Sequence, residues 1–214
     1  MTRKDEWLQL SAELGFEFKD GVNPFLDSPT LRRFAAEEMN QKDLRQAENL
    51  LRNPMVQTIL AKIFMGTASG RYRDYEYALF HSSSKGGSES HSSYTEYVNI
   101  ALFFPKDLRC DLTIEKAGRL VGLKRLFFAG KYMKIPNNEG LNHLVTVKAT
   151  DKNQAKVILG ERAIQEQLAR LYGYSNGFKV TDHGIRFKEV GGIISKARAV
   201  EIMNIMADAA DRFA

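Results

Sequence analysis

The 214-residue sequence has a single cysteine, Cys110, and no long run of apolar residues. One cysteine excludes an intramolecular disulfide framework and a zinc cluster built from cysteines, and it is typical of a reducing compartment. No stretch approaches the roughly 20 apolar residues that a membrane-spanning helix needs. The N-terminus also lacks the apolar core of a secretory signal. We therefore expect a cytoplasmic protein with no transmembrane segment.

The composition is that of an ordinary globular chain. Hydrophobic residues make up 43% of the sequence and charged residues 27%, which argues against disorder. A chain of this length hides roughly 70% of its unfolded surface on folding, so it can build a core without disulfides. The length favours one structural unit over two domains.

The first third of the sequence predicts helices. An amphipathic opening helix is indicated by apolar residues at helical spacing and a glycine at the C-cap position, namely Trp7, Leu10, Leu14 and Gly15. Two further helices are predicted to start at Ser28-Pro29 and Asn53-Pro54, where a capping side chain precedes a proline. We therefore predict an N-terminal helical segment, residues 1–69, packed on a main domain.

From Gly70 the apolar period changes from 3.6 to 2, which predicts strands. Residues 75–79 and 94–104 alternate, and the polar residues 82–90 between them indicate a long antiparallel hairpin with a flexible tip. Further strands are predicted at residues 112–114, 131–135 and 144–149, the last starting near His143.

The last third predicts one long central helix from Asp151 to Gly173, a hairpin, and a C-terminal helix capped by Ser195. The hairpin strands are residues 178–180 and 185–187, and its turn contains Asp182, His183 and Gly184. Strands joined mainly by hairpins indicate a two-layer α+β fold with a mainly antiparallel sheet. We assign this α+β domain to residues 70–214.

The C-terminal helix is apolar around most of its circumference, so more than one side must be covered. The favoured explanation is burial between the sheet and the N-terminal helices. The other explanation is a homodimer contact.

The run from Gly70 through Ile185 resembles uncharacterised prokaryotic α+β domain families with no assigned activity. The resemblance is carried by the order of a tyrosine-rich hairpin, a basic strand region, the strand 143–149, the helix 151–159 and a short hairpin before the last helix. It implies no catalytic residue and no cofactor, and it favours a non-enzymatic domain.

The basic residues are concentrated in one segment, residues 116–134, which contains no acidic residue, although the net charge of the whole chain is only +5. Apolar residues, including Phe127 and Phe128, lie between its cations, a combination that anionic membrane surfaces bind. We therefore predict an anionic partner, a membrane or an acidic protein. Nucleic acid is less favoured, because glycines interrupt the segment and no nucleic-acid motif is present. The predicted binding residues are Lys116, Arg119, Lys124, Arg125, Lys131 and Lys134.

The same segment has a second interpretation, in which it is a strand and turn of the sheet. Its apolar side chains would then lie in the core, and its cations would be solvated. The residue pattern favours this structural interpretation over an anion-binding surface by a modest margin.

His81 and His91 flank the serine- and glycine-rich hairpin tip. Strand pairing could bring the two imidazoles together, and with Glu89 or Glu96 they could bind a metal. Their spacing matches no known metal motif, and histidines in exposed hairpins usually bind nothing. A metal-dependent hydrolase or other enzyme at these histidines is therefore the alternative function, and no cofactor is predicted.

Catalytic motifs are missing from the sequence. There is no G-x-S-x-G elbow, and Gly66 to Gly70 lacks the lysine of a phosphate-binding loop. Arg109 could lower the pKa of its neighbour Cys110, but no histidine is near enough in sequence to act as a base, so an inert thiol is favoured. The leading hypothesis is a non-catalytic binding or scaffold protein that engages an anionic partner.

Overall fold

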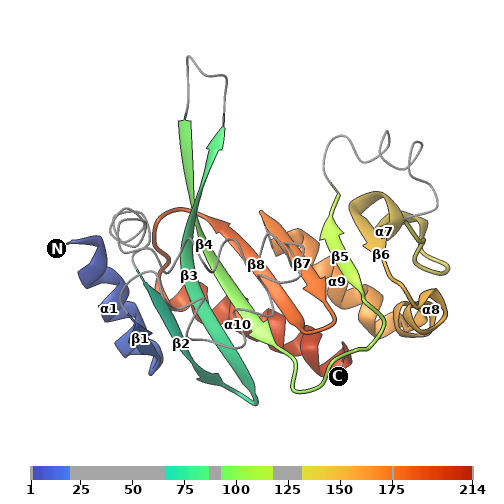
Figure 1. Ribbon diagram of the computed structural model, residues 1–214, viewed down its shortest axis with the longest axis horizontal. Helices are drawn as coiled ribbons and strands as arrows, with labels where there is room; N and C mark the ends of the chain where they lie inside the picture. Colours follow the sequence, from blue (N-terminus) through green and yellow to red (C-terminus); the bar gives the residue numbers. More distant parts are fainter. Residues whose placement is uncertain (1, 20–65, 87–92, 118–131, 175, 214) are drawn as a thin grey trace, which may run out of the picture. The chain divides into compact units, whose positions relative to one another are not determined.

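The computed structural model describes residues 2–19, 66–86, 93–117, 132–174 and 176–213 (Figure 1). Its helices are α1 (Arg3–Leu14), α7 (Glu139–Leu144), α8 (Lys152–Gly160), α9 (Arg162–Tyr174) and α10 (Lys196–Phe213). Its strands are β1 (Glu17–Lys19), β2 (Thr67–Tyr72), β3 (Tyr75–Gly86), β4 (Ser93–Phe103), β5 (Thr113–Lys116), β6 (Val145–Lys148), β7 (Gly177–Thr181) and β8 (Gly184–Val190).

These eight strands form one antiparallel sheet in the order β1-β2-β3-β4-β8-β7-β5-β6, which confirms the predicted α+β fold. By compactness the chain divides into two units, one of Met1–Ile100 with Val190–Ala199 and one of Ala101–Glu189 with Val200–Ala214. The helices predicted to start at Ser28-Pro29 and Asn53-Pro54 lie outside the described residues, and the boundary at residue 69 stays a prediction. No helix in the described ranges is long and apolar enough to cross a membrane.

The opening helix of the first unit is confirmed as α1. The side chain of Thr2 caps its N-terminus, and Gly15 ends it in the left-handed conformation with φ of 71°. Trp7 is fully buried, and its indole Nε1 donates a hydrogen bond to the carbonyl oxygen of Gly192 at 3.2 Å. This hydrogen bond satisfies the polar atom of the Trp7 side chain, and the rest of that side chain packs in the apolar core.

The predicted hairpin is confirmed as the neighbouring strands β3 and β4. The sequence prediction missed β2, which pairs with β3 through the turn after Tyr72 and places Tyr72 opposite Tyr75. The rings of Tyr72 and Tyr77 meet edge to face with centroids 6.2 Å apart, the cross-strand packing that explains tyrosines in a hairpin without a ligand.

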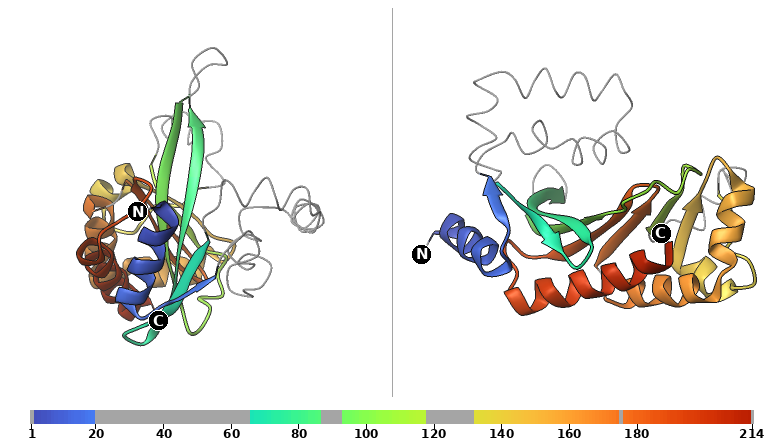
Figure 2. Two further views of the ribbon diagram at one scale, coloured as in Figure 1. Left: turned by 90° about the vertical axis from the view of Figure 1, so that its left-hand side faces the viewer. Right: turned by 90° about the horizontal axis from the view of Figure 1, so that it is seen from below.

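The sheet of the second unit has one apolar face. In the β7–β8 hairpin, Phe178 pairs with Phe187 and Val180 with Ile185, and all four side chains are buried. Helix α9 lies on this side of the strands (Figure 2) and contributes the buried residues Ile164, Leu168 and Leu171. Because side chains alternate along a strand, the opposite face carries the intervening polar and charged residues.

The predicted central helix is wrong in one respect, because it is two helices. Helix α8 ends at Gly160, and Glu161 has an extended backbone with ψ of 125° before α9 begins. The side-chain amide of Gln165 donates hydrogen bonds to the carbonyl oxygens of Leu159 at 2.8 Å and Pro136 at 3.0 Å. One carbonyl at the end of α8 is therefore satisfied without a continuing helix, and Gly160 is a poor helix former.

The strand predicted at residues 131–135 is also wrong for its described residues, which contribute only an isolated bridge between Met133 and Val147. The side chain of Asn142 explains the difference. It accepts a hydrogen bond from the Ile135 N–H at 2.7 Å and donates one to the Ile135 carbonyl at 3.0 Å, so this main chain is bonded to a side chain instead of a strand. His143 lies in the last turn of helix α7, which ends at Leu144, and does not begin a strand.

The C-terminal helix α10 begins after Ser195, as predicted, with the Ser195 hydroxyl accepting a hydrogen bond from the Arg198 N–H at 3.3 Å. Its large apolar side chains are buried within the chain, and Phe213 stacks on Phe104 with ring centroids 6.0 Å apart. No large apolar side chain of the described α10 is exposed. Intrachain burial therefore accounts for the sequence of this helix, and the homodimer contact has no support from it.

Candidate anion-binding site

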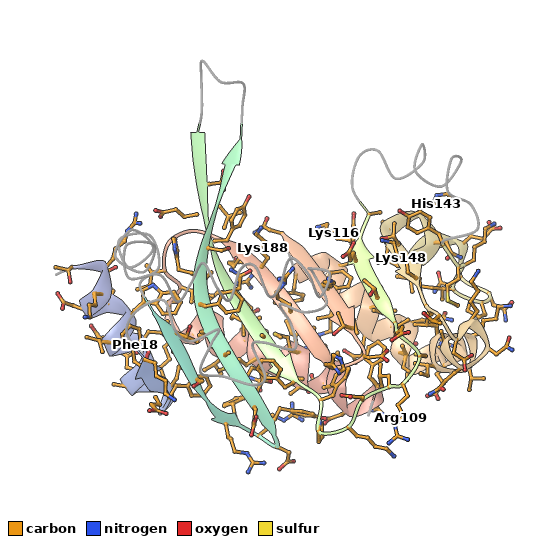
Figure 3. The ribbon with its side chains drawn as sticks, in the orientation of Figure 1. Phe18, Arg109, Lys116, His143, Lys148 and Lys188 are labelled. Carbon is orange, nitrogen blue, oxygen red and sulfur yellow. The ribbon has the colours of Figure 1, made fainter. Side chains whose placement is uncertain are left out.

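A hollow of about 720 Å³ opens on the second unit, at strands β5, β7 and β8. Four of its lining residues are basic, and we call it the basic depression, defined by Lys116, Lys179, Arg186 and Lys188. Among the described residues that line it, Glu115 carries the one carboxylate. Figure 3 labels Lys116 at the end of β5 and Lys188 on β8. The depression therefore combines a concave shape with an excess of positive charge.

Three of these cations come from the β7–β8 hairpin, and sequence reasoning missed them. The signal was present, because Lys179 lies between the buried Phe178 and Val180, and Arg186 lies between the buried Ile185 and Phe187. Lys188 follows Phe187 in the same alternation. In a strand with period two, this alternation sends the apolar side chains to the core and the cations to the other face. A hairpin with this pattern on both strands predicts a basic sheet face.

The strand register brings Glu115, Lys179 and Arg186 into one row across three strands, since Lys179 pairs with Glu115 on β5 and with Arg186 on β8. The ammonium Nζ of Lys179 lies 3.7 Å from Oε1 of Glu115. The side chain of Lys179 is only 12% exposed and that of Glu115 is 43% exposed. The cation is thus held inside the row, and the carboxylate lies nearer to solvent.

The structure describes two of the six predicted binding residues, Lys116 and Lys134. Lys116 lines the basic depression, and its ammonium lies 4.5 Å from the ring centroid of Tyr172 on α9, within cation–π range. Lys134 is exposed but does not line the depression. Arg119, Lys124, Arg125 and Lys131 lie outside the described residues, so the predicted site as a whole stays a prediction.

The turn between β7 and β8 is tied to the segment that leads into β5. The carboxylate of Asp182 is 8% exposed and accepts hydrogen bonds from the main-chain N–H groups of Cys110 at 2.9 Å, Asp111 at 2.8 Å and Leu112 at 2.6 Å. The structure shows that it satisfies a remote segment, and thereby joins the two stretches of chain that bear the basic depression.

Cys110 is buried beside this carboxylate. Burial, the negative charge of Asp182 and a hydrogen bond to Asp182 together raise the pKa of the thiol to about 12. Since the thiolate is the nucleophile, a thiol with this pKa does not act as one near neutral pH. The interpretation of Cys110 as an inert thiol agrees with this environment.

The metal hypothesis is only partly covered by the structure, because Glu89 and His91 lie outside the described residues. His81 is buried on β3. The Glu96 carboxylate accepts a hydrogen bond from the guanidinium of Arg3, which holds the pKa of that carboxyl below its usual value. Across the described ranges, no group of three or more histidine, cysteine or acidic side chains is placed to hold a metal ion.

Comparisons with known proteins show a fold and no more. No protein-family model matches the chain, and no curated protein matches it. One similar solved structure is the crystal structure of the mycobacterial trehalose monomycolate transport factor A, TtfA, with a TM-score of 0.51 and 10% sequence identity over 98% of this chain and 93% of that one. At this identity the likeness concerns the fold alone.

Proposed function

We propose that this protein is a non-catalytic binding protein that engages an anionic partner through the basic depression. The observation that carries the proposal is that four basic residues line one hollow, in which Glu115 carries the one carboxylate among the described lining residues. A concave surface with charge of one sign focuses the electrostatic field and raises the local concentration of oppositely charged partners. Binding, without a reaction, is what this set of side chains supports.

The basic segment predicted from the sequence begins at Lys116, which also lines the basic depression. Lys116 ends β5, Ala117 lines the depression, and the cations Arg119, Lys124, Arg125 and Lys131 follow along the chain. We include these residues in the proposed binding surface. Their apolar neighbours, Phe127 and Phe128, favour an anionic membrane surface over an acidic protein. A similar fold in a protein named as a transport factor is compatible with a binding role.

The proposal is tested by co-sedimentation of the protein with vesicles that contain either 30% phosphatidylglycerol or phosphatidylcholine alone, at low and at physiological salt. We expect binding only to the anionic vesicles and weaker binding at higher salt, because salt screens exposed charges beyond a Debye length of about 8 Å at 0.15 M.

Two variants of equal charge separate the depression from the overall positive charge. Changing Lys179, Arg186 and Lys188 to Gln removes three charges from the depression. Changing the exposed Lys152, Lys156 and Arg162 to Gln removes three charges from α8 and α9. We expect about a tenfold or greater loss of vesicle binding in the first variant alone, from loss of about 1 kcal/mol per cation near an anionic surface. Equal losses in both variants would refute the depression as the site.

The basic segment is tested separately by changing Lys124, Arg125, Lys131 and Lys134 to alanine. Weaker binding of this variant to the anionic vesicles would support the inclusion of the segment in the binding surface. Full retention of binding would exclude the segment and leave the depression alone as the site.

A further inference from the structure

We infer that Asn176, which lines the basic depression, is a site of spontaneous deamidation, and that the carboxylate it gains weakens anion binding there. The modification is independent of the proposed function, whereas its effect on binding rests on that function. Three features carry the inference: the dipeptide Asn176-Gly177, the exposure of Asn176, and the cations around the depression.

The dipeptide supplies the atoms for the reaction. Asn176-Gly177 is the one Asn-Gly pair in the 214-residue sequence. After loss of its proton, the main-chain nitrogen of Gly177 attacks the side-chain amide carbon Cγ of Asn176. The N–Cγ bond forms, the Cγ–Nδ2 bond breaks, and the nitrogen of the amide leaves as ammonia with a proton from water. Glycine favours this attack because it has no Cβ to hinder the close approach.

The product of the attack is a five-membered succinimide ring. Water adds to either of its two carbonyl carbons and opens the ring, which gives aspartate or isoaspartate. Both products carry a carboxylate in place of the neutral amide, and neither step needs an enzyme, a metal or a redox partner.

The fold leaves this asparagine accessible. Asn176 is exposed and lies in a bend directly before β7 begins at Gly177. Because Gly177 is the first residue of its strand, its main chain opens more readily than the middle of the strand does. The contrast is Asn142, whose side chain accepts a hydrogen bond from the Ile135 N–H at 2.7 Å and donates to two main-chain carbonyls. Its neighbour is His143, which has a side chain, so Asn142 is held as an amide.

The basic depression favours the reaction electrostatically. Gly177 pairs with Lys188 on β8 (Figure 3), and Lys179 follows two residues later on the same face. Positive charge nearby stabilises the nitrogen anion that attacks and the oxyanion that forms on the amide oxygen. Other contacts of these lysines do not remove this effect, because the field at Gly177 depends on their charge and position.

The product changes the charge of the depression by one unit. A carboxylate with a pKa of about 3.9 is ionised near neutral pH. Among the described lining residues Glu115 carries the one carboxylate, so deamidation of Asn176 gives the hollow a second. The second carboxylate repels an anionic partner, and one elementary charge near an anionic membrane corresponds to about a fivefold change in affinity. Binding at the depression therefore declines as the protein ages.

The modification is tested by incubating the purified full chain at pH 8 and 37 °C and mapping its peptides by mass spectrometry. We expect the mass gain of an amide converted to an acid at Asn176 and none at Asn142. Gly177→Ala, whose Cβ would make only an ordinary contact at 3.8 Å, should slow the gain at least about fivefold by hindering the attack. Lys188→Gln should slow it about twofold, whereas Lys152→Gln, on the exposed side of α8, should leave it unchanged.

The effect on binding is tested with two variants of equal charge. Asn176→Asp reproduces one product of the reaction, and we expect it to bind phosphatidylglycerol vesicles about fivefold more weakly than the wild type. Asn153→Asp adds the same charge at an exposed residue of α8 that does not line the depression, and it should bind nearly as the wild type does.

The outcomes separate this inference from the function on which part of it rests. A mass gain at Asn176 together with a loss of binding specific to Asn176→Asp supports the inference. No gain at Asn176 overturns it, whatever the variants bind. A gain combined with equal binding of the two aspartate variants overturns the effect on binding and leaves anionic binding standing. If the wild type binds no anionic vesicle, the proposed function and the effect on binding both fail, and the peptide map alone decides the modification.

Discussion

The carboxylate of Asp182 accepts a hydrogen bond at 2.9 Å from the main-chain N–H of Cys110, which lies 72 residues earlier in the chain. The same carboxylate accepts from the next two N–H groups, so one buried side chain satisfies three consecutive main-chain donors. Asp182 lies in the turn that joins the two strands bearing Lys179 and Arg186, and Cys110 precedes the strand that ends in Lys116. This contact therefore holds the two parts of the basic depression in register.

We expect Asp182→Asn to destabilise the protein by about 3 kcal/mol, because the amide replaces one acceptor oxygen with a donor that faces N–H groups. Urea denaturation measures the change. Asp74→Asn, at an exposed residue in the β2–β3 turn, is the matched control and should change the free energy of unfolding by less than about 0.5 kcal/mol. Equal stability of the two variants would mean that the three hydrogen bonds contribute little.

The thiol of Cys110 should resist alkylation in the folded protein. With a pKa of about 12 it is almost entirely protonated at pH 8, whereas an unfolded cysteine has a pKa of about 8.5 and is substantially ionised. We expect iodoacetamide to react at least about a thousandfold more slowly with the native protein than with the protein in urea. Rapid alkylation of the native protein would show that the thiol is accessible and ionised.

The same pKa gives the stability a pH dependence of known sign. Above pH 8.5 the unfolded thiol loses its proton while the folded thiol keeps it, so the unfolded state binds fewer protons and stability falls as pH rises. The slope approaches about 1.4 kcal/mol per pH unit from this one group. Urea titrations between pH 8 and 10 should show this fall in the wild type, and the fall should be smaller in Cys110→Ala, which has no thiol to titrate.

Gly184 should tolerate no side chain. A Cβ at this position would clash with the carbonyl oxygen of Leu102, a main-chain atom that cannot turn aside. We expect Gly184→Ala to cost about 3 kcal/mol or more, as overpacking against a rigid neighbour does. Gly177→Ala, in the other strand of the hairpin and with ordinary contacts, is the control and should be neutral or slightly stabilising. Thermal unfolding of both variants measures the difference.

The break between α8 and α9 depends on Gln165. Its amide donates to two carbonyls, and its oxygen accepts a hydrogen bond from Asn138 at 2.9 Å. Gln165→Met keeps the length of the side chain but leaves these part-buried groups without a partner, at a cost of about 2 kcal/mol. Gln9→Met, which removes only an exposed bond to Glu13, should cost less than about 0.5 kcal/mol. Similar losses in the two variants would show that Gln165 does not hold the break.

Where a structural signal is local, the sequence predicts it well. The spacing of Trp7 and Leu10 with Gly15 at the end predicts α1, and alternation predicts the β7–β8 hairpin, because both patterns follow from the geometry of a single element. The failures arise where a distant side chain competes with local preference. Asn142 bonds the main chain of Ile135 and prevents a strand, and Gln165 satisfies a carbonyl at which the helix was expected to continue.

For the basic depression too, one part of the arrangement follows from the local sequence and the other part follows from the tertiary structure. Alternation in the sequence by itself determines that Lys179 and Arg186 point away from the core side of their strands, because each lies between apolar residues that must be buried. Only the tertiary structure places β7 beside β5, and so Lys179 beside Glu115. The strand ladder joins main-chain groups that every residue shares, so the order of strands depends on how the whole core packs, and no local pattern specifies it.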